Sequence, residues 1–266
     1  MSIAPVVCCS LLLAVAPASL QAQAGPCDRA TALTLFAGLA QSDHVDVTAS
    51  PFQFRGRGLD RALEVSHSDG RWCLTADARY DSKAMSPVDD VSGVGVERLH
   101  DGDAALTLTR IVAGGRDENG GSLAVGAALR GSVSITDHSY VDPPGMMSEF
   151  RFDALSFGPA VQWRESLGRT LGLVVVEVSS AAVGVADHPY GAVWTHDDGP
   201  ELRVVSVGTL RTITGSVSYT SAPWRRLRLT ARYGIDGTRY DDVHPLRALT
   251  QTVSFGLRVP LTGAAR

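Results

Sequence analysis

Four histidines stand close to aspartates in three polar segments of the chain. They are His138, His188, His196 and His244, in segments 137–148, 185–200 and 237–246. Imidazole and carboxylate groups are ligands for zinc and similar metals, so these histidines are candidate metal ligands if the fold brings the segments together. Polar loops also carry histidine and aspartate without binding a metal, and no single segment shows a metal-ligand spacing.

Catalytic chemistry has weaker support. His67 lies directly between Ser66 and Ser68. Only positions i and i+2 share a face of a strand, so on a strand this histidine faces away from both serines. The sequence contains no glycine-rich phosphate loop and no paired catalytic carboxylates. We therefore expect a protein that is not an enzyme, with no catalytic residue and no cofactor.

Residues 1–24 are predicted to be a signal peptide, because a short apolar core at 10–20 precedes the small-x-small pattern Ala22-Gln23-Ala24. Cleavage there leaves two cysteines, Cys27 and Cys73. In an oxidising compartment two remaining cysteines favour one disulfide, although two thiols or a metal pair are the alternatives.

The charge balance excludes a strongly basic nucleic-acid binder. Lysine and arginine together number 24 against 28 aspartates and glutamates, which gives a formal net charge of −4. We expect no nucleic-acid partner.

Alternation with a period of two dominates the rest of the chain. In segment 122–136, Leu123, Val125 and Leu129 share one face, and the other face is built from small residues and Arg130. Strand side chains alternate between faces, so each such segment predicts a strand with one bulky apolar face and one small, polar face. Ten strands are predicted in this way, at 61–67, 71–80, 93–100, 104–112, 122–136, 149–164, 170–184, 201–219, 226–236 and 247–261.

Turn signals support this strand order. Asp69-Gly70 and Asp101-Gly102 are both typical of two-residue hairpin turns. Residues 25–58 form a separate N-terminal segment in this interpretation. Its stretch 28–41 is compatible with an amphipathic helix, with a plug inside the barrel, or with an additional strand, and residues 48–58 are predicted to be a linker. Residues 59–262 form the predicted barrel domain.

The polarity of the two faces favours a membrane barrel over a soluble one. A soluble barrel points its bulky apolar residues inward, whereas here the bulky face carries no charge in the clearest strands. Trp72 and Tyr80 lie eight positions apart on that face, about 26 Å along a strand, as expected for aromatic residues at two membrane interfaces. The sequence therefore predicts an all-β, antiparallel, up-and-down transmembrane β-barrel of about ten strands, with 8 to 12 possible.

In this pattern, over residues 61–261, the chain resembles the small outer-membrane β-barrel proteins of Gram-negative bacteria. The resemblance implies an outer-membrane location, lipid as a partner and a monomer, with the three histidine-bearing segments on the outer side. The chain differs from this family at its C-terminal end, where the sequence finishes in LTGAAR rather than on an aromatic residue. Some members are lipid hydrolases, which keeps that activity as an alternative.

The small, polar face is predicted to line a narrow lumen with mixed charges. Its charged residues are Glu64, Asp77, Arg79, Arg130, Arg228, Arg232 and Arg258. Buried charges need partners, so we expect an ion-pair network. The predicted function is a structural or adhesive role, or the binding or porin-like transport of a small solute, with a solute or metal ion held at the outer loops. The alternative is a soluble periplasmic barrel that binds a small hydrophobic ligand.

Overall fold

The computed structural model describes residues 30–46, 52–88, 97–114, 121–139, 147–168, 170–187, 203–224, 227–241 and 245–262. These residues form β-strands and the turns between them. The strands are β1 (Ala30–Asp46), β2 (Phe54–Ser68), β3 (Trp72–Pro87), β4 (Glu97–Gly114), β5 (Ser122–Ser139), β6 (Met147–Ser166), β7 (Leu173–Ser180), β8 (Val183–Asp187), β9 (Arg203–Ser206), β10 (Leu210–Thr220), β11 (Arg228–Tyr240) and β12 (Leu246–Thr262). The described part of the chain contains no apolar helix of membrane-crossing length.

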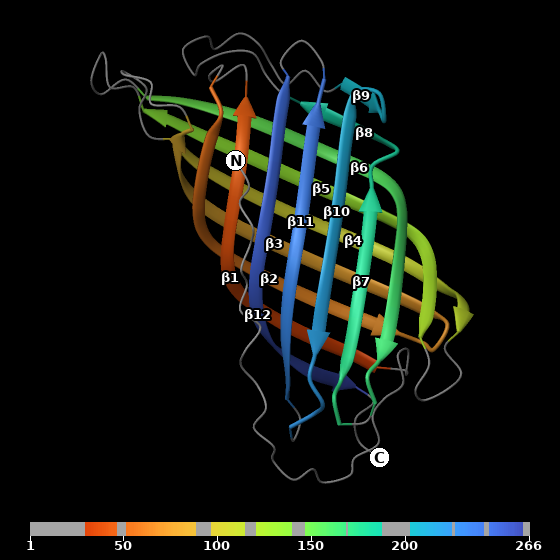
Figure 1. Ribbon diagram of the computed structural model, residues 1–266. Coiled ribbons are helices and arrows are strands. Elements are labelled where there is room, and N and C mark those ends of the chain that lie inside the picture. The colour runs from red at the N-terminus through yellow and green to blue at the C-terminus, as the bar shows by residue number, and fades with distance from the viewer. Residues whose placement is uncertain are drawn as a thin grey trace, which may run out of the picture.

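The strands close into one antiparallel barrel (Figure 1). Ten of them form the wall in the order β1, β2, β3, β4, β5, β6, β7, β10, β11 and β12, and β12 pairs back onto β1. The two additional strands are short: β8 pairs with β6 beyond the end of β7, and β9 pairs with β8. The prediction of an all-β, up-and-down barrel of about ten strands is confirmed.

The N-terminal segment is part of the barrel wall, so the helix and plug alternatives for 28–41 are wrong for the described residues from Ala30 onward. β1 pairs along its length with β2 on one side and with β12 on the other. Its leucines at 33, 35 and 39 satisfy the spacing of a strand as well as that of a helix. Closure decides between them, because without β1 the backbone groups of β2 and β12 would be left unpaired. The barrel therefore begins at residue 30 and not at 59, and the predicted linker at 48–58 is wrong from Phe54 onward, where β2 begins.

The predicted strands 93–100 and 104–112 are one strand, β4, and Asp101-Gly102 is not a turn. Asp101 pairs with Asp81 of β3 and with Ser134 of β5 in the middle of the sheet. The extra strand counted here and the strand missed at β1 cancel, which is why the predicted number was right. The turn at Asp69-Gly70 is confirmed: Gly70 has a φ of 93°, and Asp69 Oδ1 accepts bonds from two following backbone N–H groups at 2.9 and 2.7 Å.

The two ends of the barrel can be told apart by the strand register. Thr31 is paired with Thr262, so the first and last strands start and finish at the same end, which we call the terminal end. The Asp69-Gly70 turn also lies there, because Ala30 is paired with Ser68. The opposite end, at the top of Figure 1, is the loop end, from which β5 leads to β6, β8 to β9 and β11 to β12. The three histidine-bearing segments therefore connect strands at the loop end.

The outward face carries a band of exposed apolar side chains, which we call the apolar belt. Leu35, Leu63, Leu129 and Phe157 belong to it, and Phe255, the most exposed of these, has 67% of its surface accessible. Toward the loop end the polarity of the wall reverses. Outward positions there are polar, as in the Arg55–Asp43 ion pair at 2.6 Å. Inward positions there become apolar. The wall thus continues beyond the apolar belt as a barrel with the polarity of a soluble protein.

Candidate functional site: the charged lumen

All seven charged residues predicted for the lumen lie on inward strand positions. Glu64, for example, is buried between the outward-facing Leu63 and Val65, which are 42% and 37% exposed. Arg228 and Arg258 are register partners on β11 and β12. The structure brings most of the seven into two groups, one midway along the lumen and one toward the terminal end.

The middle group is a chain of ion pairs that crosses the lumen. Arg79 Nε donates to Asp60 Oδ1 at 2.6 Å, and its Nη1 donates to Asp236 Oδ2 at 2.6 Å. Arg130 Nη1 donates to the other oxygen of Asp236 at 2.8 Å, and Arg130 Nη2 lies 3.0 Å from Asp103 Oδ1. We call these five residues the transverse chain.

Strand order explains why this chain of ion pairs crosses the barrel. Asp236 belongs to β11, whereas Asp60, Arg79, Asp103 and Arg130 belong to β2, β3, β4 and β5. β11 is three or more strands away from each of these along the wall, so the carboxylate of Asp236 joins opposite sides of the lumen. Because both of its oxygens are occupied, Asp236 is the central acceptor of the network.

The second group lies toward the terminal end. Glu64 accepts from Arg232, and Arg258 Nη1 lies 3.4 Å from the other oxygen of Glu64. Arg258 Nη2 also donates to Ser66 Oγ at 2.7 Å. The guanidinium of Arg232 lies 4.0 Å from the ring centroid of Phe36, a cation–π contact. Glu64 on β2 therefore ties β11 and β12 across the lumen.

A third group, toward the loop end, was missed by the sequence analysis. Lys83 Nζ lies 2.5 Å from Asp81 Oδ1 and donates to Asp101 Oδ2 at 2.6 Å, and its side chain is 0% exposed. Lys83 is the only lysine of the chain. Period-two alternation continuing past Tyr80 was the available signal, since it places Asp81 and Lys83 on the inward face with Asp77 and Arg79.

Asp77 takes a different position from the other six predicted residues. It lies inward on β3, one inward position toward the terminal end from Arg79, and its register partners are Glu64 and Ala105. Within the described residues it has no ion pair at contact distance. Asp77 therefore lies beside the transverse chain without being a link in it.

Above the charged groups, apolar side chains fill the lumen at the loop end. One cluster contains Phe54, Met85 and Leu99. The other contains Phe152, Ala154, Ala186, Val205, Leu210, Tyr240 and Leu246. The rings of Phe152 and Tyr240 are 5.5 Å apart. Together these clusters form an apolar cap, which was not predicted.

The space left beside the transverse chain is small. A cavity of about 60 Å³ is lined by Arg79, Arg130, Asp236 and their neighbours. That volume holds a few water molecules and no larger solute. The lumen therefore combines a crossing ion-pair chain, a small cavity beside it and an apolar cap.

The candidate metal ligands fall largely outside the described residues. His188, His196 and His244 lie there, and the structure describes His138 only in its backbone, near the loop end of β5. Within the described ranges no group of three or more histidine, cysteine or acidic residues is placed to hold a metal ion. The zinc site at the loops stays a prediction.

Cys73 faces the lumen at the terminal end, where its Sγ lies 3.7 Å from Ser68 Oγ. Cys27 and the predicted signal peptide lie outside the described residues. His67 faces outward and shares a hydrogen bond of 2.9 Å with Thr31 Oγ1. The neighbouring Ser68 is buried, so these two side chains point to opposite faces of the wall.

Comparison with known proteins agrees with this architecture. No protein-family model and no curated protein sequence matches the chain. Among solved structures, the outer membrane protease OmpT from Escherichia coli is similar with a TM-score of 0.55 and 8% identity, over 91% of this chain and 99% of that one.

Two further structures match with lower scores. Ail, the attachment invasion locus protein of Yersinia pestis, matches with a TM-score of 0.36 and 9% identity, over 86% of this chain and 99% of that one. The COG4313 outer membrane channel from Pseudomonas putida F1 matches with a TM-score of 0.35 and 10% identity, over 92% and 100%. The similarity to OmpT shows that the chain has the fold of a Gram-negative outer-membrane β-barrel.

Proposed function

We propose that this protein is an outer-membrane barrel with a closed lumen, which serves as a structural or adhesive anchor through its loop end. The apolar belt supports a membrane location, because exposed side chains such as Leu129 and Phe255 would face water in a soluble barrel. The predicted signal peptide supports export, and the antiparallel closure leaves no unpaired edge inside lipid.

The main support for a closed lumen comes from two ion pairs, which link Arg79 to Asp236 and Asp236 to Arg130. A conducting barrel needs a continuous water-filled path, and here charged side chains from opposite walls meet in the middle of the lumen. The apolar cap adds a second barrier at the loop end. A small solute would bind at the loop end, because the cavity beside the transverse chain has room only for a few water molecules.

Two measurements test this proposal. The full chain, refolded into detergent or vesicles, should migrate faster on a gel before heating than after heating, as a stable membrane barrel does. In planar bilayers it should show no steady conductance. A protein that fractionates as soluble periplasmic material would contradict the membrane location. Reproducible single-channel steps from the purified protein would contradict the closed lumen.

A further inference from the structure

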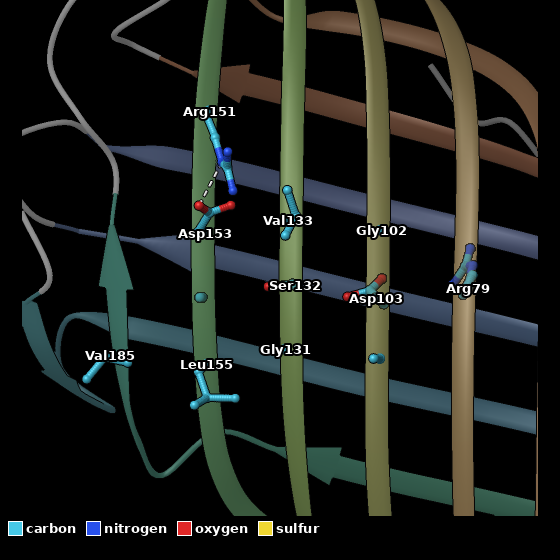
Figure 2. A pocket seen from close by; sticks show the side chains of 12 residues that line it. Arg79, Gly102, Asp103, Gly131, Ser132, Val133, Arg151, Asp153, Leu155 and Val185 are labelled. Atoms are coloured by element: carbon cyan, nitrogen blue, oxygen red, sulfur yellow. Dashed lines mark ion pairs between the residues drawn. The ribbon is translucent and has the colours of Figure 1, made fainter. Parts of the chain in front are cut away.

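The outward surface of β4, β5 and β6 is hollowed at the edge of the apolar belt (Figure 2). The hollow has a volume of about 530 Å³. Gly102, Ala104 and Gly131 form its floor, because they carry little or no side chain. Val133 and Leu155 lie beside this floor. Gly131 is paired with Ala104 on β4 and with Leu155 on β6, so the hollow extends over three neighbouring strands.

Backbone packing does not require the glycines of the hollow. A Cβ atom on Gly102 would come no closer than 4.0 Å to another atom, and one on Gly131 no closer than 3.9 Å. By contrast, a Cβ on the inward-facing Gly58 or Gly126 would come within 1.8 or 1.9 Å of a backbone oxygen. The inward glycines are needed to form the wall, whereas Gly102 and Gly131 leave open space on its lipid side.

Basic side chains surround the loop-end side of this hollow. Arg61 is two strands from Gly102 in the same register row, with Tyr80 between them. Arg98 lies on β4 itself, four positions beyond Gly102 on the same outward face. Arg57 and Arg98 are both register partners of Ala84. Arg151 stands above Leu155 and forms an ion pair of 2.7 Å with Asp153.

The charge near the hollow is only partly neutralised. Among the described residues Arg61 and Arg98 have no ion pair, and Arg57 donates to the uncharged Gln41 at 3.1 Å. Two acids lie nearby. Asp153 pairs with Arg151, whereas Asp137 is the register partner of Arg98 and lies 3.7 Å from His100, whose Nδ1 is bonded to the Tyr80 hydroxyl at 2.9 Å. The arginines at 57, 61 and 98 outnumber the Asp137 carboxylate, so among the described residues a net positive surface adjoins the apolar hollow.

We propose that this surface binds one phosphate-bearing membrane lipid. An acyl chain lies in the hollow over Gly102, Ala104 and Gly131, and the headgroup phosphate lies between Arg61 and Arg98. Gly102 is about 10 Å from Arg61 across two strand spacings and about 13 Å from Arg98 along β4, distances that one lipid molecule spans. Arginine binds phosphate oxygens with paired N–H donors, and apolar surface at the belt edge accepts the chain.

The charge also argues against a second copy of the barrel as the occupant. Two copies related by a two-fold axis would bring the same patch of each molecule together. Arg61 and Arg98 of both copies would then lie in one interface. Like charges brought together in this way oppose association, whereas an anionic headgroup relieves the repulsion.

Native mass spectrometry tests the proposal, which rests on the membrane location proposed above. The full chain is placed in nanodiscs that contain phosphatidylglycerol and phosphatidylcholine with identical acyl chains, and the lipids retained after release are counted. We expect one retained phosphatidylglycerol per barrel. The double variant Arg61→Gln/Arg98→Gln should lose the preference for the anionic lipid, by about fivefold for each arginine. Gly131→Leu, which fills the hollow, should abolish retention of either lipid.

Matched controls lie elsewhere on the wall. Gly215 is an outward-facing glycine of β10 with no atom within 4 Å of an added Cβ, and Gly215→Leu should leave retention unchanged. Arg247→Gln removes an outward-facing arginine of β12 and should also have no effect. The heat-dependent gel shift is measured on every variant. Absence of that shift in the wild type contradicts the membrane location itself.

Equal retention of both lipids by the wild type, or unchanged retention in the Arg61→Gln/Arg98→Gln variant, would overturn the lipid site while leaving the barrel proposal intact. A retained second protein copy that disappears in Gly131→Leu would also overturn it, in favour of a dimer. If Gly131→Leu does not fold, the result for Arg61→Gln/Arg98→Gln alone decides whether the lipid site exists.

Discussion

Arg79 on β3 and Asp236 on β11 meet across the lumen, with Nη1 and Oδ2 2.6 Å apart. The two strands are four positions apart in the wall of the barrel. The contact therefore joins parts of the wall that share no backbone hydrogen bonds, and Arg130 reaches the same carboxylate from a third strand. Asp236 is consequently the residue whose removal should disturb the lumen most.

Replacement of Asp236 by asparagine should destabilise the barrel strongly. The change leaves the guanidinium groups of Arg79 and Arg130 without their shared carboxylate, and breaking a buried ion pair costs about 3–5 kcal/mol. Urea unfolding in vesicles, followed by tryptophan fluorescence, measures the loss. The control is Asp241→Asn, which breaks the half-exposed pair between Arg239 and Asp241 and should cost about 0–1 kcal/mol. Equal losses for the two variants would contradict the role of Asp236.

Lys83 should resist chemical labelling in the folded barrel. It is the only lysine of the chain, and its amine is enclosed between Asp81 and Asp101. An amine-reactive reagent should therefore modify Lys83 only after unfolding, with peptide mass spectrometry as the readout. Rapid modification of Lys83 in protein that still shows the heat-dependent gel shift would mean that the lumen is open to reagents of this size.

The reversal of polarity along the wall predicts where charge is tolerated on the outward face. Leu129 lies in the apolar belt and is 42% exposed, so Leu129→Arg should destabilise the inserted barrel by about 2–4 kcal/mol. Ala84 also faces outward but lies between Arg57 and Arg98 beyond the belt, so Ala84→Arg should cost about 0–1 kcal/mol. The free energy of unfolding from vesicles measures both costs. Equal costs for Leu129→Arg and Ala84→Arg would mean that the apolar belt does not end between these two positions.

The disulfide between Cys27 and Cys73 stays a prediction, and strand register makes it testable. Ser68 is paired with both Ala30 and Cys73, so Ala30 is about 10 Å from Cys73 across two strand spacings. Cys27 is three residues before Ala30, and three residues span at most about 10 Å. Mass spectrometry of non-reduced, alkylated protein should detect a linked peptide pair. Recovery of both cysteines in alkylated form would contradict the bond.

Alternation along single segments was enough to predict which side chains face the lumen. The face of a strand residue depends only on its parity, so Arg79, Arg130 and Arg232 could be placed inward without knowledge of any partner strand. The same rule would also have placed Lys83 inward, but it was not applied there, because a turn signal at Asp101-Gly102 and the polar stretch after Tyr80 suggested that the strands ended. Both segments continue as strands because β3 and β4 pair with each other over that length.

The sequence by itself determined the class of fold and the polarity of its two faces, since both follow from period-two alternation and from residue type. Tertiary structure decided which segments complete the wall, which charges meet and where the apolar belt ends. β1 is a strand because closure must pair the backbone of β2 and β12, and Asp236 meets Arg79 because the closed ring brings opposite walls together. Those relationships depend on the curvature of the whole barrel, which no single segment encodes.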